Sequence, residues 1–169
     1  MKHIHTFDYR TNKDEMHPNR IAGRAVIIKD HSLFLINLKA TNEFKFPGGG
    51  LEENESYKDT VIRETLEESG AKITYIKECL GYIDQIYPDK YEKNKVFYLR
   101  NIYYLCDIAD DLGNQSLSKS ESKLDFHPEW VNIDKAIKVN ENRLLLGTKY
   151  HWTERELYMF KYIKETLIK

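Results

Sequence analysis

Two apolar runs near the start of the chain are continuous rather than alternating. Residues 25–28 read Ala-Val-Ile-Ile and residues 33–36 read Leu-Phe-Leu-Ile, with Lys-Asp-His-Ser between them. Continuous apolar runs of this length are typical of strands that are covered on both faces. We therefore expect two buried strands, at 25–28 and 32–36, joined by a tight turn at 29–31.

Two longer β-prone stretches follow, at residues 72–87 and 95–108. Pro88-Asp89-Lys90 lies between them and marks a turn, which predicts an antiparallel pair. Residues 110–123 are rich in serine and charge, and we expect a polar loop there. Cys79 and Cys106 fall in apolar, strand-like segments and form no C-x-x-C pattern, which predicts buried free thiols.

Apolar residues recur at helical spacing near the C-terminus. They are Leu157, Phe160, Ile163 and Leu167. Thr153 and Glu156 precede them at the spacing of a capping box, so we predict a helix over 153–168 that packs on the sheet.

A second helix is predicted between Ser56 and Gly70. Ser56 with Asp59 resembles a capping box, and Gly70 is a typical helix stop. A helical wheel places one set of residues on a core-facing flank: Val61, Ile62, Thr65, Leu66 and Ser69. Three carboxylates fall roughly opposite, and these are Glu64, Glu67 and Glu68.

Like charges on one helical face repel by roughly 0.2–0.5 kcal/mol per pair, so this acidic face favours a nearby cation. Mg²⁺ commonly binds one or two protein carboxylates together with substrate phosphate. The preceding Pro47 excludes a central strand, and the three glycines at 48–50 allow close approach of the backbone to a ligand. A solvated acidic helix is the alternative interpretation of the carboxylates alone.

The whole spaced set resembles the Nudix box, the signature of hydrolases of nucleoside diphosphates linked to another group X. All its charged and glycine positions are present: Gly49, Glu55, Arg63, Glu64, Glu67, Glu68 and Gly70. Thr65 and Ala71 depart from the box, which usually has bulky aliphatic residues there. Neither departure changes the acidic face.

The resemblance implies an α/β (α+β) fold, a Nudix-type α/β/α sandwich with a mixed central β-sheet. We expect one domain over 1–169, with an N-terminal arm or strand at 1–18. Residues 126–131 resemble the closing strand of the family, with a short helix from about Asp134.

The resemblance also implies a metal site. Glu64, Glu67 and Glu68 would coordinate Mg²⁺, with Mn²⁺ as a substitute, together with a backbone carbonyl of Gly48 or Gly49. Glu67 and Glu68 would take part directly in catalysis.

Other polar residues receive supporting roles by their position in the box or the chain. Arg63 would orient the carboxylates through charge-assisted hydrogen bonds, and Glu55 would brace Arg63. Family members often supply a further carboxylate from a later loop, for which Glu121 is our first candidate and Glu129 our second. A solvated loop acid is the alternative for each.

Substrate contacts are less specified by the sequence. Arg24 and Lys39 are candidates for binding phosphate, and Tyr87 and Phe97 for stacking on a base. Solvated basic residues and ordinary sheet aromatics are the alternatives. In the family that the chain resembles, a proline about sixteen residues after the box tends to accompany ADP-ribose, and a tyrosine near that place accompanies dinucleoside polyphosphates. This chain has both, Tyr87 and Pro88, so the rule does not identify the substrate.

Composition restricts the classes of partner. The 169 residues are 41% hydrophobic and 31% charged, and 26 basic residues nearly balance 27 acidic ones. This balance gives the protein no overall electrostatic attraction to nucleic acid or to a membrane surface. No run in the sequence approaches the roughly 18 apolar residues of a membrane span. The polar first twenty residues contain no apolar leader, which predicts a cytoplasmic protein; His3 and His5 are interpreted as a surface pair.

We therefore predict an enzyme that hydrolyses the pyrophosphate bond of a nucleoside diphosphate derivative: a nucleoside triphosphate, ADP-ribose, a nucleotide sugar or a dinucleoside polyphosphate. One alternative is a nucleotide-sensing module without catalysis, against which the intact acidic set argues. Another is an RNA-end decapping enzyme, for which a basic stripe would be expected. A homodimer is left open.

Overall fold

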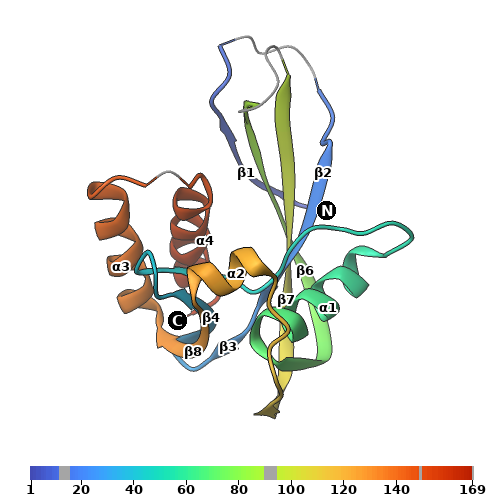
Figure 1. Ribbon diagram of the computed structural model, residues 1–169, viewed down its shortest axis with the longest axis vertical. Coiled ribbons are helices and arrows are strands. Elements are labelled where there is room, and N and C mark those ends of the chain that lie inside the picture. The colour runs from blue at the N-terminus through green and yellow to red at the C-terminus, as the bar shows by residue number, and fades with distance from the viewer. Residues whose placement is uncertain (12–15, 90–94, 149, 169) are drawn as a thin grey trace.

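A computed structural model describes residues 1–11, 16–89, 95–148 and 150–168 (Figure 1). In chain order the elements are β1 (His3–Asp8), β2 (Arg20–Val26), β3 (Ile28–Lys29), β4 (Ser32–Leu38), β5 (Glu43–Lys45), α1 (Tyr57–Ser69), β6 (Ala71–Pro88), β7 (Val96–Leu112), α2 (Lys119–Leu124), β8 (Phe126–Asn132), α3 (Ile133–Leu145) and α4 (Trp152–Thr166).

The first sheet has four strands in the order β1-β6-β7-β2. Its central hairpin, β6 with β7, is antiparallel as predicted, and its register runs from Ala71 opposite Leu112 to Pro88 opposite Val96. Both outer strands are parallel to their neighbours, so the sheet is mixed. Part of the predicted turn, at Lys90, lies outside the described residues.

The second sheet joins β3, β4 and β5, and β8 pairs with β4. The predicted tight turn is confirmed, because Ile28 pairs with Leu33 and Asp30 adopts a positive φ of 53°. The strand before this turn begins earlier than expected, at Arg20, and the chain passes from the first sheet to the second after Val26. β4 is almost wholly buried, as its continuous apolar run predicts.

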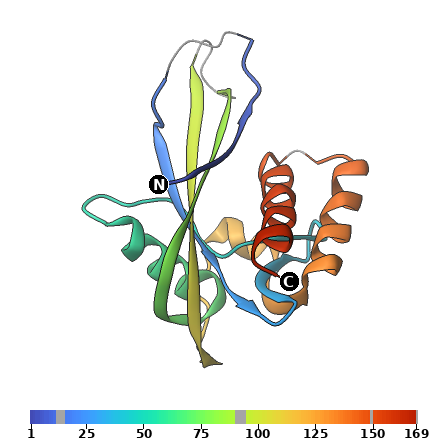
Figure 2. The same ribbon diagram turned by 180° about the vertical axis from the view of Figure 1, so that it is seen from behind.

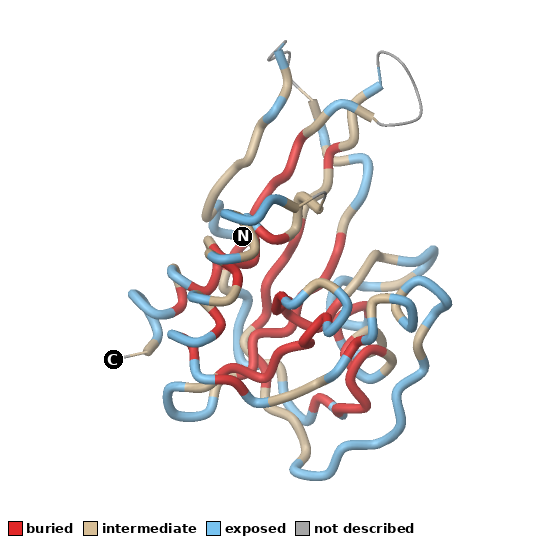
Figure 3. Tube along the Cα trace, turned by 60° about the vertical axis from the view of Figure 1, so that its left-hand side comes forward, coloured by how far each residue is buried: buried red, intermediate tan, exposed pale blue. Residues whose placement is uncertain are grey.

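Helices cover the sheets from two sides. In Figures 1 and 2, α1 lies against the β6–β7 hairpin and β2, while α3 and α4 lie together on the opposite side of the molecule. The buried residues form a continuous band through the strands between these layers (Figure 3). The predicted α/β/α arrangement with a mixed sheet is confirmed. No helix in the described part of the chain is long and apolar enough to cross a bilayer.

The C-terminal helix forms, but its predicted capping box is wrong. α4 begins at Trp152, and no side chain makes a capping hydrogen bond at its start. Thr153 instead donates to the buried Glu43 carboxylate at 2.5 Å, and Glu156 accepts from the backbone amide of Phe46 at 3.0 Å. Both polar groups therefore fasten the helix to strands.

The predicted core flank of α1 is wrong in two positions. Ile62 and Leu66 are 40% and 45% exposed, whereas Thr60, Val61 and Glu68 are buried. The helix is rotated so that one of its carboxylates faces inward, since the loop at 48–50 supplies a polar surface for it to bind.

Three smaller expectations also change. Cys79 is exposed, and only Cys106 is buried among these two free thiols. The predicted polar loop is shorter than expected, because β7 continues to Leu112 and α2 forms at Lys119–Leu124. The helix predicted as a short one from about Asp134 spans 13 residues. By contrast, the prediction of an arm or strand at 1–18 is confirmed, because β1 forms there.

Candidate active site

Helix α1 is held at both ends by the groups that the sequence predicts. Ser56 and Asp59 form a capping box, and Gly70 ends the helix in a left-handed conformation at φ 70°. Gly23 on β2 lies against the first turn of the helix, where an added Cβ would meet Val61 and the Tyr57 carbonyl at 3.2–3.3 Å. This close contact fixes the helix beside the loop at 48–50.

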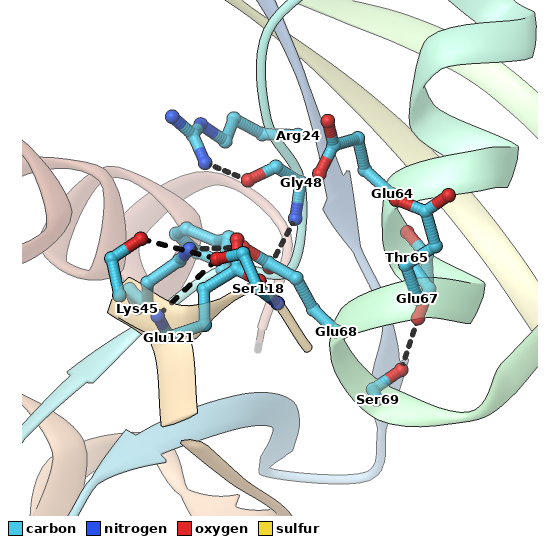
Figure 4. Close-up of polar contacts among 12 residues, drawn as sticks. Arg24, Lys45, Gly48, Glu64, Thr65, Glu67, Glu68, Ser69, Ser118 and Glu121 are labelled. Atoms are coloured by element: carbon cyan, nitrogen blue, oxygen red, sulfur yellow. Dashed lines mark hydrogen bonds and ion pairs between the residues drawn. The ribbon is translucent and has the colours of Figure 1, made fainter. Parts of the chain in front are cut away.

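Glu68 is the buried acid of the site, with 3% of its surface exposed. One carboxylate oxygen accepts a hydrogen bond from Lys45 Nζ at 2.6 Å, and the other accepts from the Gly48 amide at 2.9 Å (Figure 4). Burial raises the pKa of Glu68, while Lys45 and Arg24 act in the opposite direction. A buried carboxylate requires positive charge beside it, and here a lysine supplies it.

Arg63 connects the other carboxylates. Its Nε and Nη2 donate to the two oxygens of Glu55 at 2.7 and 2.9 Å, which is a bidentate pair. Its Nη1 donates to Glu64 at 2.9 Å and to Glu67 at 3.3 Å, and Nη2 also donates to the Gly50 carbonyl. The hydrogen bonds from Arg63 lower the pKa of Glu55 to about 2, so Glu55 stays ionised above that pH.

Glu64 and Glu67 differ in their surroundings. The Glu64 carboxylate lies against Gly49, where a Cβ would overlap it, and it lines the pocket. Glu67 is 43% exposed and does not belong to the described pocket lining. The pocket therefore contains two carboxylates of α1, Glu64 and Glu68, one helical turn apart (Figure 4).

The donor chemistry of this pair fits a divalent cation such as Mg²⁺. Hard cations take oxygen ligands, and one or two carboxylates with waters and substrate phosphate commonly complete the shell. Among the described residues no three histidine, cysteine or acidic side chains converge as a ready ligand set. The protein thus offers a partial shell, in which Glu64 and Glu68 now have Arg63 and Lys45 as counter-ions.

A pocket of about 840 Å³ opens beside these carboxylates. Five basic side chains belong to its described lining: Arg20, Arg24, Lys45, Lys123 and Arg155. Four carboxylates also belong to it: Glu64, Glu68, Asp89 and Glu121. Basic side chains thus outnumber carboxylates by one in this lining, whereas the whole chain has a formal net charge of −1. Guanidinium and ammonium groups beside the carboxylates favour an anionic ligand that a cation accompanies.

Aromatic side chains also line the pocket. Tyr87 stacks on Phe97 at a ring-centroid distance of 5.1 Å and on His151 at 4.3 Å. Tyr150 and Trp152 form a second stacked pair at 4.0 Å, and all five residues line the pocket. These stacked rings offer aromatic surface on which a bound base could pack.

The predicted site residues separate into two groups. Most lie together at the pocket or on its supporting network: Arg24, Gly48, Gly49, Glu55, Arg63, Glu64, Glu67, Glu68, Tyr87, Phe97 and Glu121. Lys39 and Glu129 instead lie outside the described pocket lining and form an ion pair with each other at 3.5 Å. Glu121 accepts from the Ser118 amide at the start of α2.

Sequence reasoning missed several residues of the pocket. Five residues line the pocket but are not among those that the sequence predicts for the site: Arg20, Lys45, Gln85, Trp152 and Arg155. Their strands and helix meet the pocket only after folding, so no local spacing marks them. The one available signal is a polar pair, Arg155-Glu156, on the helical face that also carries Phe160 and Ile163.

We predict that Gly49→Ala reduces activity while the fold persists. The added methyl group would displace the flexible Glu64 carboxylate rather than backbone atoms. By contrast, Gly48→Ala would place its Cβ on the Gly23 carbonyl at a φ of 138° that favours glycine. Steady-state kinetics and thermal unfolding of both variants check this contrast; a large loss of stability in Gly49→Ala would contradict it.

The comparison with protein families agrees with this geometry. The model of the NUDIX domain family matches residues 18–152. The chain therefore belongs to the NUDIX family and is a Nudix hydrolase, an enzyme of the class that hydrolyses pyrophosphate bonds in nucleoside diphosphate derivatives. A search of curated proteins finds no match.

Solved structures share the fold at low sequence identity. A NUDIX hydrolase from Nitrosomonas europaea is 16% identical, with 90% of this chain and 93% of that chain covered and a TM-score of 0.60. A MutT NUDIX hydrolase from Burkholderia pseudomallei is 21% identical, with 84% and 97% covered and a TM-score of 0.55. The MutT protein from Bacillus halodurans is 20% identical, with 71% and 72% covered and a TM-score of 0.54.

Proposed function

We propose that this protein catalyses Mg²⁺-dependent hydrolysis of the pyrophosphate bond in a small nucleoside diphosphate derivative. The observation that carries the proposal is the placement of Glu64 and Glu68 in one pocket with an excess of basic side chains. A carboxylate pair suits a divalent cation, and the surrounding guanidinium and ammonium groups suit phosphate oxygens.

The residues of the chain divide the work of such a reaction. A divalent cation held by Glu64 and Glu68 would neutralise charge on the phosphoryl groups. Arg63 keeps Glu64 and Glu67 in place from the outer side of α1, and Glu55 in turn fixes Arg63. Phe97 and the Tyr150–Trp152 pair offer aromatic surface to a base.

Proton transfer from the attacking water requires an unprotonated acceptor near the phosphate. Glu67 is accessible on α1, and Glu121 lines the pocket from α2 (Figure 4). Both remain candidates for this role; Glu129, paired with Asn37 and Lys39, has neither position.

A substrate panel tests the proposal. The protein would be incubated with nucleoside triphosphates, ADP-ribose, nucleotide sugars and dinucleoside polyphosphates, with Mg²⁺, with Mn²⁺ and with EDTA, and products would be separated by chromatography. We expect metal-dependent cleavage of at least one class. Tight nucleotide binding in calorimetry without turnover would instead identify a sensing module, and release of a cap from RNA would identify a decapping enzyme.

A further inference from the structure

Three cationic side chains of the pocket lining are buried. Arg24, Lys45 and Arg155 are 8%, 9% and 2% exposed, and all three belong to the pocket lining. They come from β2, β5 and α4, so three separate segments of the chain bring positive charge to one place.

Lys45 and Arg155 each form an ion pair with a carboxylate, whereas the hydrogen bonds of Arg24 go to no carboxylate. Lys45 pairs with Glu68, and Arg155 pairs with Glu156 through a short hydrogen bond. Arg24 donates to two neutral acceptors, the Asn101 side-chain oxygen at 3.2 Å and the Gly48 carbonyl. This group of side chains therefore has an excess of positive charge.

Burial of such an excess is costly unless an anion accompanies it. Desolvation lowers the pKa of Arg24, and the neighbouring charge of Arg155 lowers it further. Both guanidinium groups lie on the lining of the same pocket, and the positive charge of each disfavours the charged form of the other. A phosphoryl group, which accepts hydrogen bonds from guanidinium groups in a planar, charge-assisted arrangement, would relieve this repulsion.

Arg155 is held in a fixed orientation for such a contact. Its Nη1 donates to the Gln85 side-chain oxygen at 2.7 Å, and Nη2 donates to Glu156. Burial lowers the pKa of Arg155, but Glu156 and Tyr103 raise it above its ordinary value, so this guanidinium stays charged. Arg24 is linked to the acidic helix through a single residue, because the Gly48 carbonyl accepts from Arg24 and the Gly48 amide donates to Glu68.

We propose that Arg155 acts with Arg24 to bind a phosphoryl group of the substrate, so that helix α4 contributes a phosphate contact in addition to the aromatic ring of Trp152. The inference rests on the proposed function and extends it, since Arg155 lies beyond the segment 18–152 that matches the family. A purely structural role, in which Arg155 only neutralises Glu156, is the competing explanation.

Calorimetric titration with inorganic pyrophosphate in EDTA separates these explanations without requiring turnover. The double variant Arg155→Met/Glu156→Gln removes the ion pair as a unit and leaves no buried carboxylate unpaired. We expect it to bind pyrophosphate about 10- to 100-fold more weakly than the parent, the loss typical of charge-assisted hydrogen bonds. Arg24→Met should weaken binding in the same range.

For the matched controls we expect no weakening of pyrophosphate binding. Glu156→Gln keeps Arg155 but removes its negative partner, so pyrophosphate should bind at least as tightly as in the parent. Lys161→Met removes an exposed charge from the same helix, where Lys161 pairs with Glu141, and should change nothing. Circular dichroism checks that each variant is folded. Arg155→Lys is a milder second variant, because it keeps the charge but loses the planar arrangement of donors. We expect it to weaken pyrophosphate binding by an intermediate amount.

Three outcomes would overturn the proposal: no pyrophosphate binding by the parent in EDTA, unchanged binding by the folded double variant and Arg155→Lys, or an equal loss in Glu156→Gln. The proposed hydrolysis can fail independently. If the protein binds pyrophosphate through Arg155 yet cleaves no member of the substrate panel, the phosphate site is supported and the proposed hydrolysis is contradicted.

Discussion

Replacement of Glu68 by glutamine is expected to lower the rate of pyrophosphate hydrolysis by roughly 10²–10⁴-fold. The glutamine carbonyl can still accept from the Gly48 amide, but the group loses the negative charge that a divalent cation requires. Steady-state kinetics over a range of Mg²⁺ concentrations measures the effect. Because a weaker metal site is part of the cause, the variant should also need more Mg²⁺ for half-maximal activity.

Glu68→Gln leaves the buried Lys45 ammonium without its carboxylate, which can destabilise the fold. A loss of stability therefore has to be separated from a loss of catalytic activity in this variant. The double variant Lys45→Met/Glu68→Gln removes both charges, and we expect it to regain thermal stability without regaining activity. Glu53→Gln, an exposed position on the loop before α1, is the matched control and should retain full activity. Full activity in folded Glu68→Gln would exclude Glu68 from the reaction.

Replacement of Arg63 by methionine is expected to lower activity about 10- to 100-fold, the loss typical when groups that orient metal ligands are removed. Glu64 and Glu67 then lose a common hydrogen-bond donor and repel each other. Arg63→Lys should not restore activity, because one ammonium group cannot make the bidentate contact to Glu55. Kinetics at saturating Mg²⁺ checks this loss.

The same variant should alter the pH dependence of stability. The pKa of Glu55 in the folded protein is about 2, compared with an ordinary value of 4.5. A depressed folded-state pKa contributes stability above pH 4.5 that is lost as the pH falls toward 2. Urea unfolding between pH 2.5 and 6 should therefore show a smaller decline for Arg63→Met than for the parent. Equal declines would mean that Arg63 does not hold Glu55 ionised.

The sequence predicts the acidic helix and its ends because these depend on local chemistry. The capping pair Ser56 and Asp59 and the left-handed Gly70 act within a few residues of themselves, so their spacing is visible in the chain. The buried face of the helix depends on what lies opposite. Ile62 and Leu66 were assigned to the core by periodicity alone, whereas contact with the glycine loop turns Glu68 inward instead.

The same distinction explains the errors at α4. Thr153 and Glu156 have the spacing of a capping box, yet their side chains bind Glu43 and the Phe46 amide. Tertiary hydrogen bonds to buried groups outweigh a cap that water could replace at a helix end. Arg155 was missed for a related reason, since its partner Gln85 is 70 residues away in the chain.

Helix α4 is fastened to the strands by its own polar contacts, from Thr153 and Glu156 to β5 and its continuation, and from the His151 carbonyl, which accepts from Gln85 at 2.8 Å. None of these bonds involves α1. Substitutions on the pocket side of α4 can therefore accumulate without disturbing the acidic helix. Natural selection can change which molecules enter the pocket by altering α4, while the acidic residues of α1 that carry the reaction are inherited intact.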